Sequence, residues 1–198
     1  MTTLFKTVSA ALLLGAAAVP AAAQQLSPPV IVIVDMDRVV NESAAGKQAG
    51  TDLQAKAQQL ATRRTTLAGQ LQSEAQAIGQ GQQNKTLAGP ALEQRVKAFQ
   101  DKEAAANAEL QRGQEDLGRS RQYVIQQIST ASDPIITQVM RERGASIALQ
   151  KGATLQHTAS LEVTNDVIGR LNTSLPKVSI TPPAAPAPAQ PAPAAPRN

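Results

Sequence analysis

The sequence lacks the side chains on which most catalytic and metal sites depend. Its 198 residues include no Cys and no Trp, one His, one Tyr and two Phe. Without Cys, a disulfide, a thiolate zinc site, an iron–sulfur cluster and a Cys nucleophile are all excluded. A single His excludes a multi-histidine metal site and leaves little for general acid–base chemistry. We therefore predict no catalytic residues, no metal site and no cofactor, and we interpret the protein as a non-enzyme.

Aromatic residues make up only 2% of the chain. Because aromatic side chains supply the largest buried areas of a core, this scarcity disfavours a compact catalytic fold. It also argues against nucleic-acid binding, which uses aromatic rings to stack bases. Abundant Ala, Gln and Leu instead favour long helices with small side chains.

The first 23 residues have the pattern of a signal peptide. Lys6 supplies the positive charge, residues 10–19 form an apolar run, and Ala21–Ala23 offer small residues for cleavage near Ala23. The apolar run is shorter than the ~20 residues that span a bilayer, which disfavours a membrane anchor. No Cys follows for lipidation. We expect a soluble mature protein in a bacterial periplasm, with 18 basic and 15 acidic residues and a net charge of +3.

Proline dominates the other end of the chain. Residues 176–198 contain 8 of the 13 prolines. Because Pro blocks helix formation and lacks a backbone donor, we predict a disordered, unpacked Pro/Ala-rich tail. Two interpretations stay open for this tail, a spacer and a Pro-rich ligand for a partner.

Strands are predicted near both ends of the remaining chain. The β-branched run 30–34 indicates one buried strand. Asp35 and Asp37 follow it and favour a turn or helix cap over a cation site. Alternating residues on both sides of Gly152 predict a β-hairpin over 146–159. A short helix then begins with Thr164 as its N-cap, with Ile168 and Leu171 facing inward.

Two long helices are predicted between these strands. From Arg38 to Ile78 the chain has no Pro, and Leu53, Leu60 and Leu67 are spaced by seven as in a coiled coil. Glycines in residues 79–84 predict the end of this helix, and a second helix runs from Pro90 to a C-cap at Gly144. Asp133-Pro134 fits either a kink or a new helix start.

These elements predict an α+β fold that is mostly α. Residues 24–40 and 144–175 form a small β body with a short terminal helix, and residues 41–143 form a long antiparallel coiled-coil hairpin arm. Three short strands bury little apolar area and leave open edges, so we expect the body to oligomerise. The residues predicted for the oligomer body are Val30, Ile31, Val32, Ile33, Val34, Ile147, Leu149 and Leu155.

The arm has a weak apolar seam and an excess of positive charge. Between Leu53 and Phe99 we count six basic residues against Glu74 and Glu93, a net charge of +4. Such a surface attracts acidic polypeptides or anionic lipid, whereas the alternative is a solvated helix face with ordinary i,i+4 pairs. The candidate contacts for a client or anion are Arg63, Arg64, Lys85, Arg95 and Lys97.

Two further motifs are interpreted as structural. Residues 79–86 nearly match a phosphate-binding loop, but Asn84 stands at its second Gly and no strand is predicted before it. His157 lies in a strand-like segment without a second His or any Cys, so we interpret it as a structural or surface residue.

Both ends of the predicted folded region resemble the Skp/OmpH family of periplasmic chaperones. Residues 30–47 resemble the family's opening, a hydrophobic strand ending in Asp, followed by a helix with the pattern Ser43-x-x-Gly46-Lys47. Residues 161–172 resemble the terminal helix of the family. The resemblance covers residues 30–173.

The resemblance implies a homotrimer with a barrel-like β body and three helical arms around a cavity. It implies an ATP-independent holdase that binds unfolded outer-membrane proteins and prevents their aggregation, with possible contact to anionic lipid or lipopolysaccharide and none to nucleic acid. This arm is more Gln-rich and less charged than the family pattern, and the Pro/Ala tail is an addition. The alternative hypothesis is a periplasmic adaptor that docks an envelope complex through its hairpin tip, residues 79–90.

Overall fold

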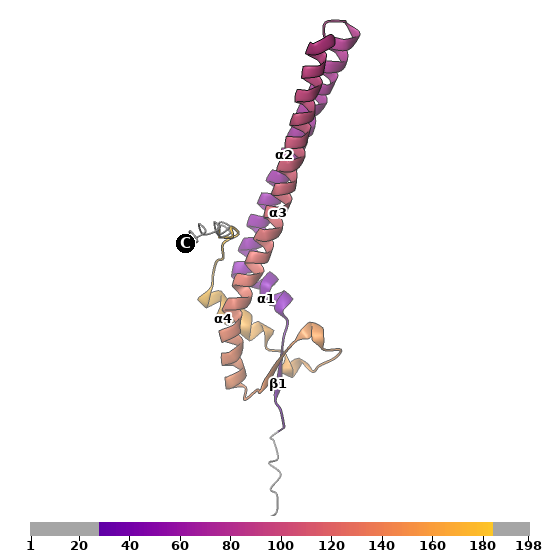
Figure 1. Cartoon of the computed structure of the whole chain (residues 1–198). Helices are drawn as coiled ribbons and strands as arrows, with labels where there is room; N and C mark the ends of the chain where they lie inside the picture. The colour runs from indigo at the N-terminus through magenta and orange to yellow at the C-terminus, as the bar shows by residue number, and fades with distance from the viewer. Residues whose placement is uncertain (1–27, 184–198) are drawn as a thin grey trace, which may run out of the picture.

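The computed structural model describes residues 28–183, a small body from which one long helical hairpin projects (Figure 1). The predicted signal peptide and residues 184–198 of the predicted tail lie outside this range. In chain order the elements are β1 (Ile31–Val34), α1 (Met36–Glu42), α2 (Ala44–Gln83), α3 (Gly89–Glu142), β2 (Ile147–Gln150), the 3₁₀ turns η1 (Lys151–Ala153) and η2 (Ala159–Leu161), and α4 (Thr164–Ser174). The protein is therefore mostly helical with a two-stranded sheet.

The sheet joins the two ends of the folded region. β1 and β2 are parallel, with Ile31 opposite Ile147 and Val34 opposite Gln150. Parallel strands need a long crossover connection, and here α1, α2 and α3 supply it. The hairpin arm is thus an insertion between two neighbouring strands of one sheet.

The predicted β-hairpin over residues 146–159 is wrong. Only its first strand exists, because the chain turns into η1 directly after Gln150. There the Lys151 ammonium lies 3.5 Å from Asp35 and 3.4 Å from Glu162, which holds the chain over the end of β1. The next strand-like contact to β1 is an isolated parallel bridge between Ile33 and Glu162. The second predicted strand therefore does not form, and the ion pairs of Lys151 hold this segment at the end of the sheet.

The helix predicted from Arg38 onward consists of two helices. Asp35 caps α1 by accepting a hydrogen bond from the backbone N–H of Arg38 at 3.0 Å, as its predicted cap role requires. At Ser43 the chain becomes extended, with φ −63° and ψ 156°. The Ser43 hydroxyl then accepts from the backbone N–H of Gly46 at 3.1 Å and begins α2. An N-cap inside the predicted helix thus divides it.

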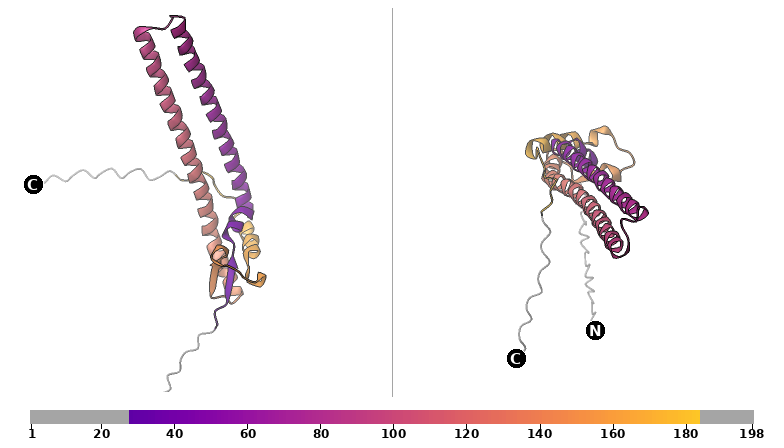
Figure 2. Two further views of the ribbon diagram at one scale, coloured as in Figure 1. Left: turned by 90° about the vertical axis from the view of Figure 1, so that its right-hand side faces the viewer. Right: turned by 90° about the horizontal axis from the view of Figure 1, so that it is seen from above.

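α2 and α3 lie side by side along the arm (Figures 1 and 2). α2 passes the glycines at 79 and 81 and ends at Gln83, because a single Gly costs only about 1 kcal/mol in a helix. α3 continues through Pro134, which excludes the new helix start that the sequence left open. Gly144 follows α3 with φ +64°, a left-handed conformation that suits its predicted place at the helix end.

The core lies where the base of the arm meets β1, α1 and α4. Its most deeply buried large side chains are Ile128, Leu171, Val39, Val139 and Val167. Each contributes roughly 1.5–3 kcal/mol by leaving water. Leu171 faces inward as predicted, and Ile168 is half-buried against the same cluster.

The start of the predicted unpacked tail belongs to the folded body. Val178 and Ile180 pack against the core, although Pro176 precedes them. The segment after Pro176 is not helical, as expected for a Pro-rich sequence. An irregular segment can nevertheless bury apolar side chains, and this one does. The prediction of an unpacked tail from residue 176 is therefore wrong for residues 176–183.

Candidate functional surfaces

The two segments that carry the family resemblance contact each other at the end of β1. The Thr164 hydroxyl accepts a hydrogen bond from the backbone N–H of Asp35 at 2.9 Å and donates to the Glu162 carboxylate at 3.2 Å. Thr164 is therefore not the N-cap that the sequence predicts; Val163 holds that position. Its hydroxyl instead connects the N-terminal strand with the C-terminal helix.

Arg38 extends this junction. Its guanidinium donates to Glu42 at 2.9 Å, to Glu162 at 3.2 Å and to the Asn165 side chain at 2.9 Å. Farther along, the backbone N–H of Ala44 donates to the Asn172 side chain at 2.7 Å. These polar contacts fix the base of the arm on α4 and are structural in character.

Glu162 is the centre of the polar cluster. It accepts from Lys151, Thr164 and Arg38, and lies 3.4 Å from the His157 ring. Hydrogen bonding to His157, followed by the contacts to Thr164 and Lys151, lowers the pKa of Glu162 although its partial desolvation opposes the shift. His157 thus has a structural partner.

The residues predicted for the oligomer body fall into two groups. Val32, Ile33 and Val34 are buried within the single chain. Ile31 is half-buried. The exposed fractions of the others are 47% for Val30, 39% for Ile147, 37% for Leu149 and 104% for Leu155. The residue before β1, the strand β2 and the loop after it therefore present apolar side chains that residues 28–183 leave exposed.

Ion pairs connect the two helices of the arm. Lys56 pairs with Asp116 at 2.5 Å, and Arg63 pairs with Glu109 at 2.6 Å. Seven residues separate Lys56 from Arg63 on α2, and seven separate Glu109 from Asp116 on α3, so the pairs recur along the facing surfaces. The Arg63 hydrogen bond is the main cause of a lowered pKa of Glu109.

The predicted client or anion contacts differ in their surroundings. Arg63 is paired across the arm, Arg95 lies 3.6 Å from Glu74, and Lys97 lies 3.4 Å from Asp101 on its own helix. Arg64 and Lys85 are exposed and form no ion pair within residues 28–183. The net charge of +4 predicted for residues 53–99 leaves out acidic residues later in α3, and two of these, Glu109 and Asp116, pair with α2.

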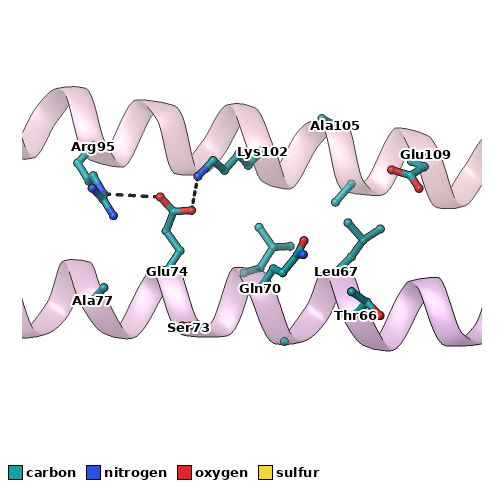
Figure 3. A pocket seen from close by; sticks show the side chains of 13 residues that line it. Thr66, Leu67, Gln70, Ser73, Glu74, Ala77, Arg95, Lys102, Ala105 and Glu109 are labelled. Atoms are coloured by element: carbon teal, nitrogen blue, oxygen red, sulfur yellow. Dashed lines mark hydrogen bonds and ion pairs between the residues drawn. The ribbon is translucent and has the colours of Figure 1, made fainter.

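A cavity of about 870 Å³ separates α2 from α3 in the distal arm (Figure 3). Leu67, Leu71, Ala105 and Ala106 form much of its apolar wall. Glu74 lies between Arg95 and Lys102 at one end, and hydrogen bonding from Lys102 is the main cause of its lowered pKa. The sequence analysis missed Lys102, whose role emerges only from the pairing of the two helices.

The near match to a phosphate-binding loop is a helix end and turn. The backbone N–H groups of Thr86 and Leu87 both donate to the carbonyl oxygen of Gly81 at 2.9 Å. They are thus used within the turn and do not form a phosphate cradle. Within the described range, no group of three or more His, Cys, Asp or Glu side chains is arranged to hold a metal ion. No described helix has the length and apolar character needed to cross a membrane.

Residues 30–171 match the family of OmpH-like outer membrane proteins. The chain belongs to the OmpH-like family. The match begins just before β1 and ends within α4, so it includes both strands, the whole arm and the contacts of Thr164 and Glu162 between them.

The OmpH-like fold is also seen in a solved structure. A candidate outer membrane chaperone (OmpH-like) from Caulobacter crescentus CB15 has a TM-score of 0.69 to this chain at 23% sequence identity. The likeness covers 78% of this chain and 90% of that one. Among curated proteins, no match to the sequence was found.

Proposed function

We propose that the mature protein is a periplasmic, ATP-independent holdase that binds unfolded outer-membrane proteins between the arms of a homotrimer. The observation that carries the proposal is a long arm attached to a body with exposed apolar side chains just before β1, on β2 and in the loop that follows β2. The chaperone role is supported by membership of the OmpH-like family and by the shared fold with the OmpH-like outer membrane chaperone from Caulobacter crescentus.

The body supports self-association. A two-stranded sheet leaves open edges, and such edges usually pair or become covered. The exposed side chains of Ile147 and Leu149 lie on the strand that forms one of these edges. Copies of the chain that join there would bury these side chains and direct their arms to one side.

The arm supports binding of variable clients. Only four of the 40 residues of α2 are buried, and two of these are alanines near its base. Ion pairs between exposed side chains add little, roughly 0–1 kcal/mol each. Such an arm deforms easily, and a client held by many weak contacts is released when a better acceptor binds it. Arg64 and Lys85 would attract acidic clients or anionic lipid over about a Debye length.

Two measurements test the proposal. Sedimentation of the chain from residue 24 onward should give about three times the protomer mass, and Leu149→Asp should lower it. Ile125→Asp, which changes an exposed side chain on the arm, is the matched control and should leave the mass unchanged. The wild-type protein should also suppress light scattering by a urea-unfolded outer-membrane β-barrel protein at near-stoichiometric trimer.

Two results would contradict the proposal. One is a stable monomer together with undiminished scattering at several-fold excess. The other is binding of one saturable partner that is lost when only the tip, residues 79–90, is changed, as an adaptor requires.

A further inference from the structure

A segment that follows α4 packs against α3 of the same chain. Residues 177–181, here called the strap, follow α4 and cross to α3 (Figure 2). The Gln127 side-chain amide donates to the backbone carbonyl of Ser179 at 2.8 Å, and the backbone N–H of Ser179 donates to the same amide's oxygen at 3.1 Å. Gln127 thus pairs with both backbone groups of one residue, Ser179, as a residue of a neighbouring strand would.

The strap has two unlike faces. Val178 and Ile180 are half-buried and pack against the core, whereas Ser179 and Thr181 are exposed. Alternation with a period of two is the pattern of an extended segment with one apolar face. The site therefore accepts two apolar side chains spaced by two residues, together with the backbone between them.

The strap is held by few contacts. It belongs to no helix or strand, and its polar contacts to α3 come from Gln127 alone. Its two anchoring side chains remain partly accessible to water. A segment held in this way exchanges between docked and released states more readily than the helices around it.

We propose that the α3 surface around Gln127 is a binding site for extended polypeptide segments of alternating apolar and polar residues, and that the strap is its internal competitor. This inference rests on the proposed function. Strands of outer-membrane β-barrels alternate apolar and polar residues, so an unfolded barrel protein offers many segments of this kind. A client segment that displaces the strap uses the same two apolar positions and the same Gln127 contacts.

Competition has a measurable consequence. If the strap is docked about ten times as often as it is released, it weakens client binding at this site about tenfold. A variant whose strap cannot dock should therefore bind a matching segment about tenfold more tightly. A variant that also lacks the Gln127 amide should lose much of this gain.

The experiment uses the full mature chain and a fluorescent nine-residue peptide with the sequence of residues 175–183. The double variant Val178→Ser/Ile180→Ser releases the strap. Adding Gln127→Ala removes the side-chain amide that hydrogen-bonds to the backbone of the docked segment. Gln126→Ala, an exposed neighbour on α3, is the matched control. A second peptide of the same composition places the Val and Ile side by side. We expect tighter binding of the first peptide to the strap variant, loss of that gain with Gln127→Ala, no effect of Gln126→Ala, and no comparable binding of the second peptide.

A second measurement keeps the test valid if the strap variant unfolds. Because the chain has no Cys, Thr181→Cys provides a single labelling position on the exposed face of the strap. Excess unfolded barrel protein should change the emission of this label as the strap is displaced. Unchanged emission, or equal peptide affinities in a folded strap variant and the wild type, would overturn the inference. If the wild type still suppresses aggregation in those cases, the proposed holdase function stands and only the strap site is rejected.

Discussion

Gly46 lies directly against the end of α1: a Cβ at this position would stand 1.6 Å from the carbonyl oxygen of Val40. The atom that blocks a side chain there belongs to the backbone, which cannot rotate away as a side chain does. This close approach lets α1 and α2 meet at the Ser43 cap. The glycine of the family-like Ser-x-x-Gly pattern therefore has a steric role.

We predict that Gly46→Ala destabilises the protein by about 3 kcal/mol or more, because the helices must separate or their backbone must distort. Gly50→Ala is the matched control in the same helix, since nothing lies within 4 Å of its added Cβ. It should stabilise by up to about 1 kcal/mol through helix propensity. Thermal and urea unfolding of both variants measure the difference, and similar values for the two would contradict the steric role.

The Thr164 hydroxyl should matter more than its methyl group. Thr164→Val keeps the shape of the side chain but leaves the backbone N–H of Asp35 without its acceptor. We expect a loss of roughly 1–3 kcal/mol, the usual cost of an unsatisfied buried donor. Thr164→Ser retains the hydroxyl and should recover most of the stability in urea unfolding. A serine variant as unstable as the valine variant would show that packing, not the hydrogen bond, is responsible.

Acid should weaken the contact between α3 and α4. Hydrogen bonding from Arg170 lowers the pKa of Glu142 from 4.5 to about 2. Because the folded state has the lower pKa, this carboxylate stabilises the fold above about pH 4.5, and its contribution is lost as the pH falls toward 2. Glu142→Gln should flatten the fall of the thermal midpoint between pH 5 and pH 2, whereas Glu103→Gln on the exposed arm should not. Parallel pH curves for wild type and Glu142→Gln would exclude this contribution.

The five predicted arm cations should act on the rate of client capture. Replacing Arg63, Arg64, Lys85, Arg95 and Lys97 by Gln should slow capture mainly at low salt, because ions screen long-range attraction. The double variant Arg64→Gln/Lys85→Gln should account for much of this effect, since these two side chains lack ion pairs in the described part of the arm. Stopped-flow measurements with a labelled unfolded client at several salt concentrations provide the test. Rates that fall equally at all ionic strengths would count against electrostatic attraction.

Periodic and local signals in the sequence were sufficient for the main architecture. The β-branched run predicts β1, the helix-forming stretches predict a hairpin, and Gly144 marks the end of α3. Each of these signals acts through neighbouring residues in the chain. The family resemblance of residues 30–47 and 161–172 is confirmed by the match over residues 30–171.

Contacts between distant residues explain what the sequence did not predict. The turn after β2 depends on Lys151 meeting Asp35, and the packed strap depends on Gln127 meeting Ser179. The interruption between α1 and α2 at Ser43 depends on nearby residues only. The sequence did not predict it because the residues on both sides of Ser43 strongly favour one continuous helix. Charge balance in the arm likewise requires the register of α2 on α3, which places Glu109 beside Arg63.

Because β1 and β2 are parallel neighbours joined by the arm, the length of the arm can change without a change in the sheet. Because the entire hairpin is a connection between two adjacent strands, inserting seven residues at facing positions of α2 and α3 would extend the tip by about 10 Å. The seven-residue repeat of facing ion pairs would be preserved, and no atom of the sheet would need to move. Evolution or engineering can therefore lengthen or shorten the arm while keeping one common base.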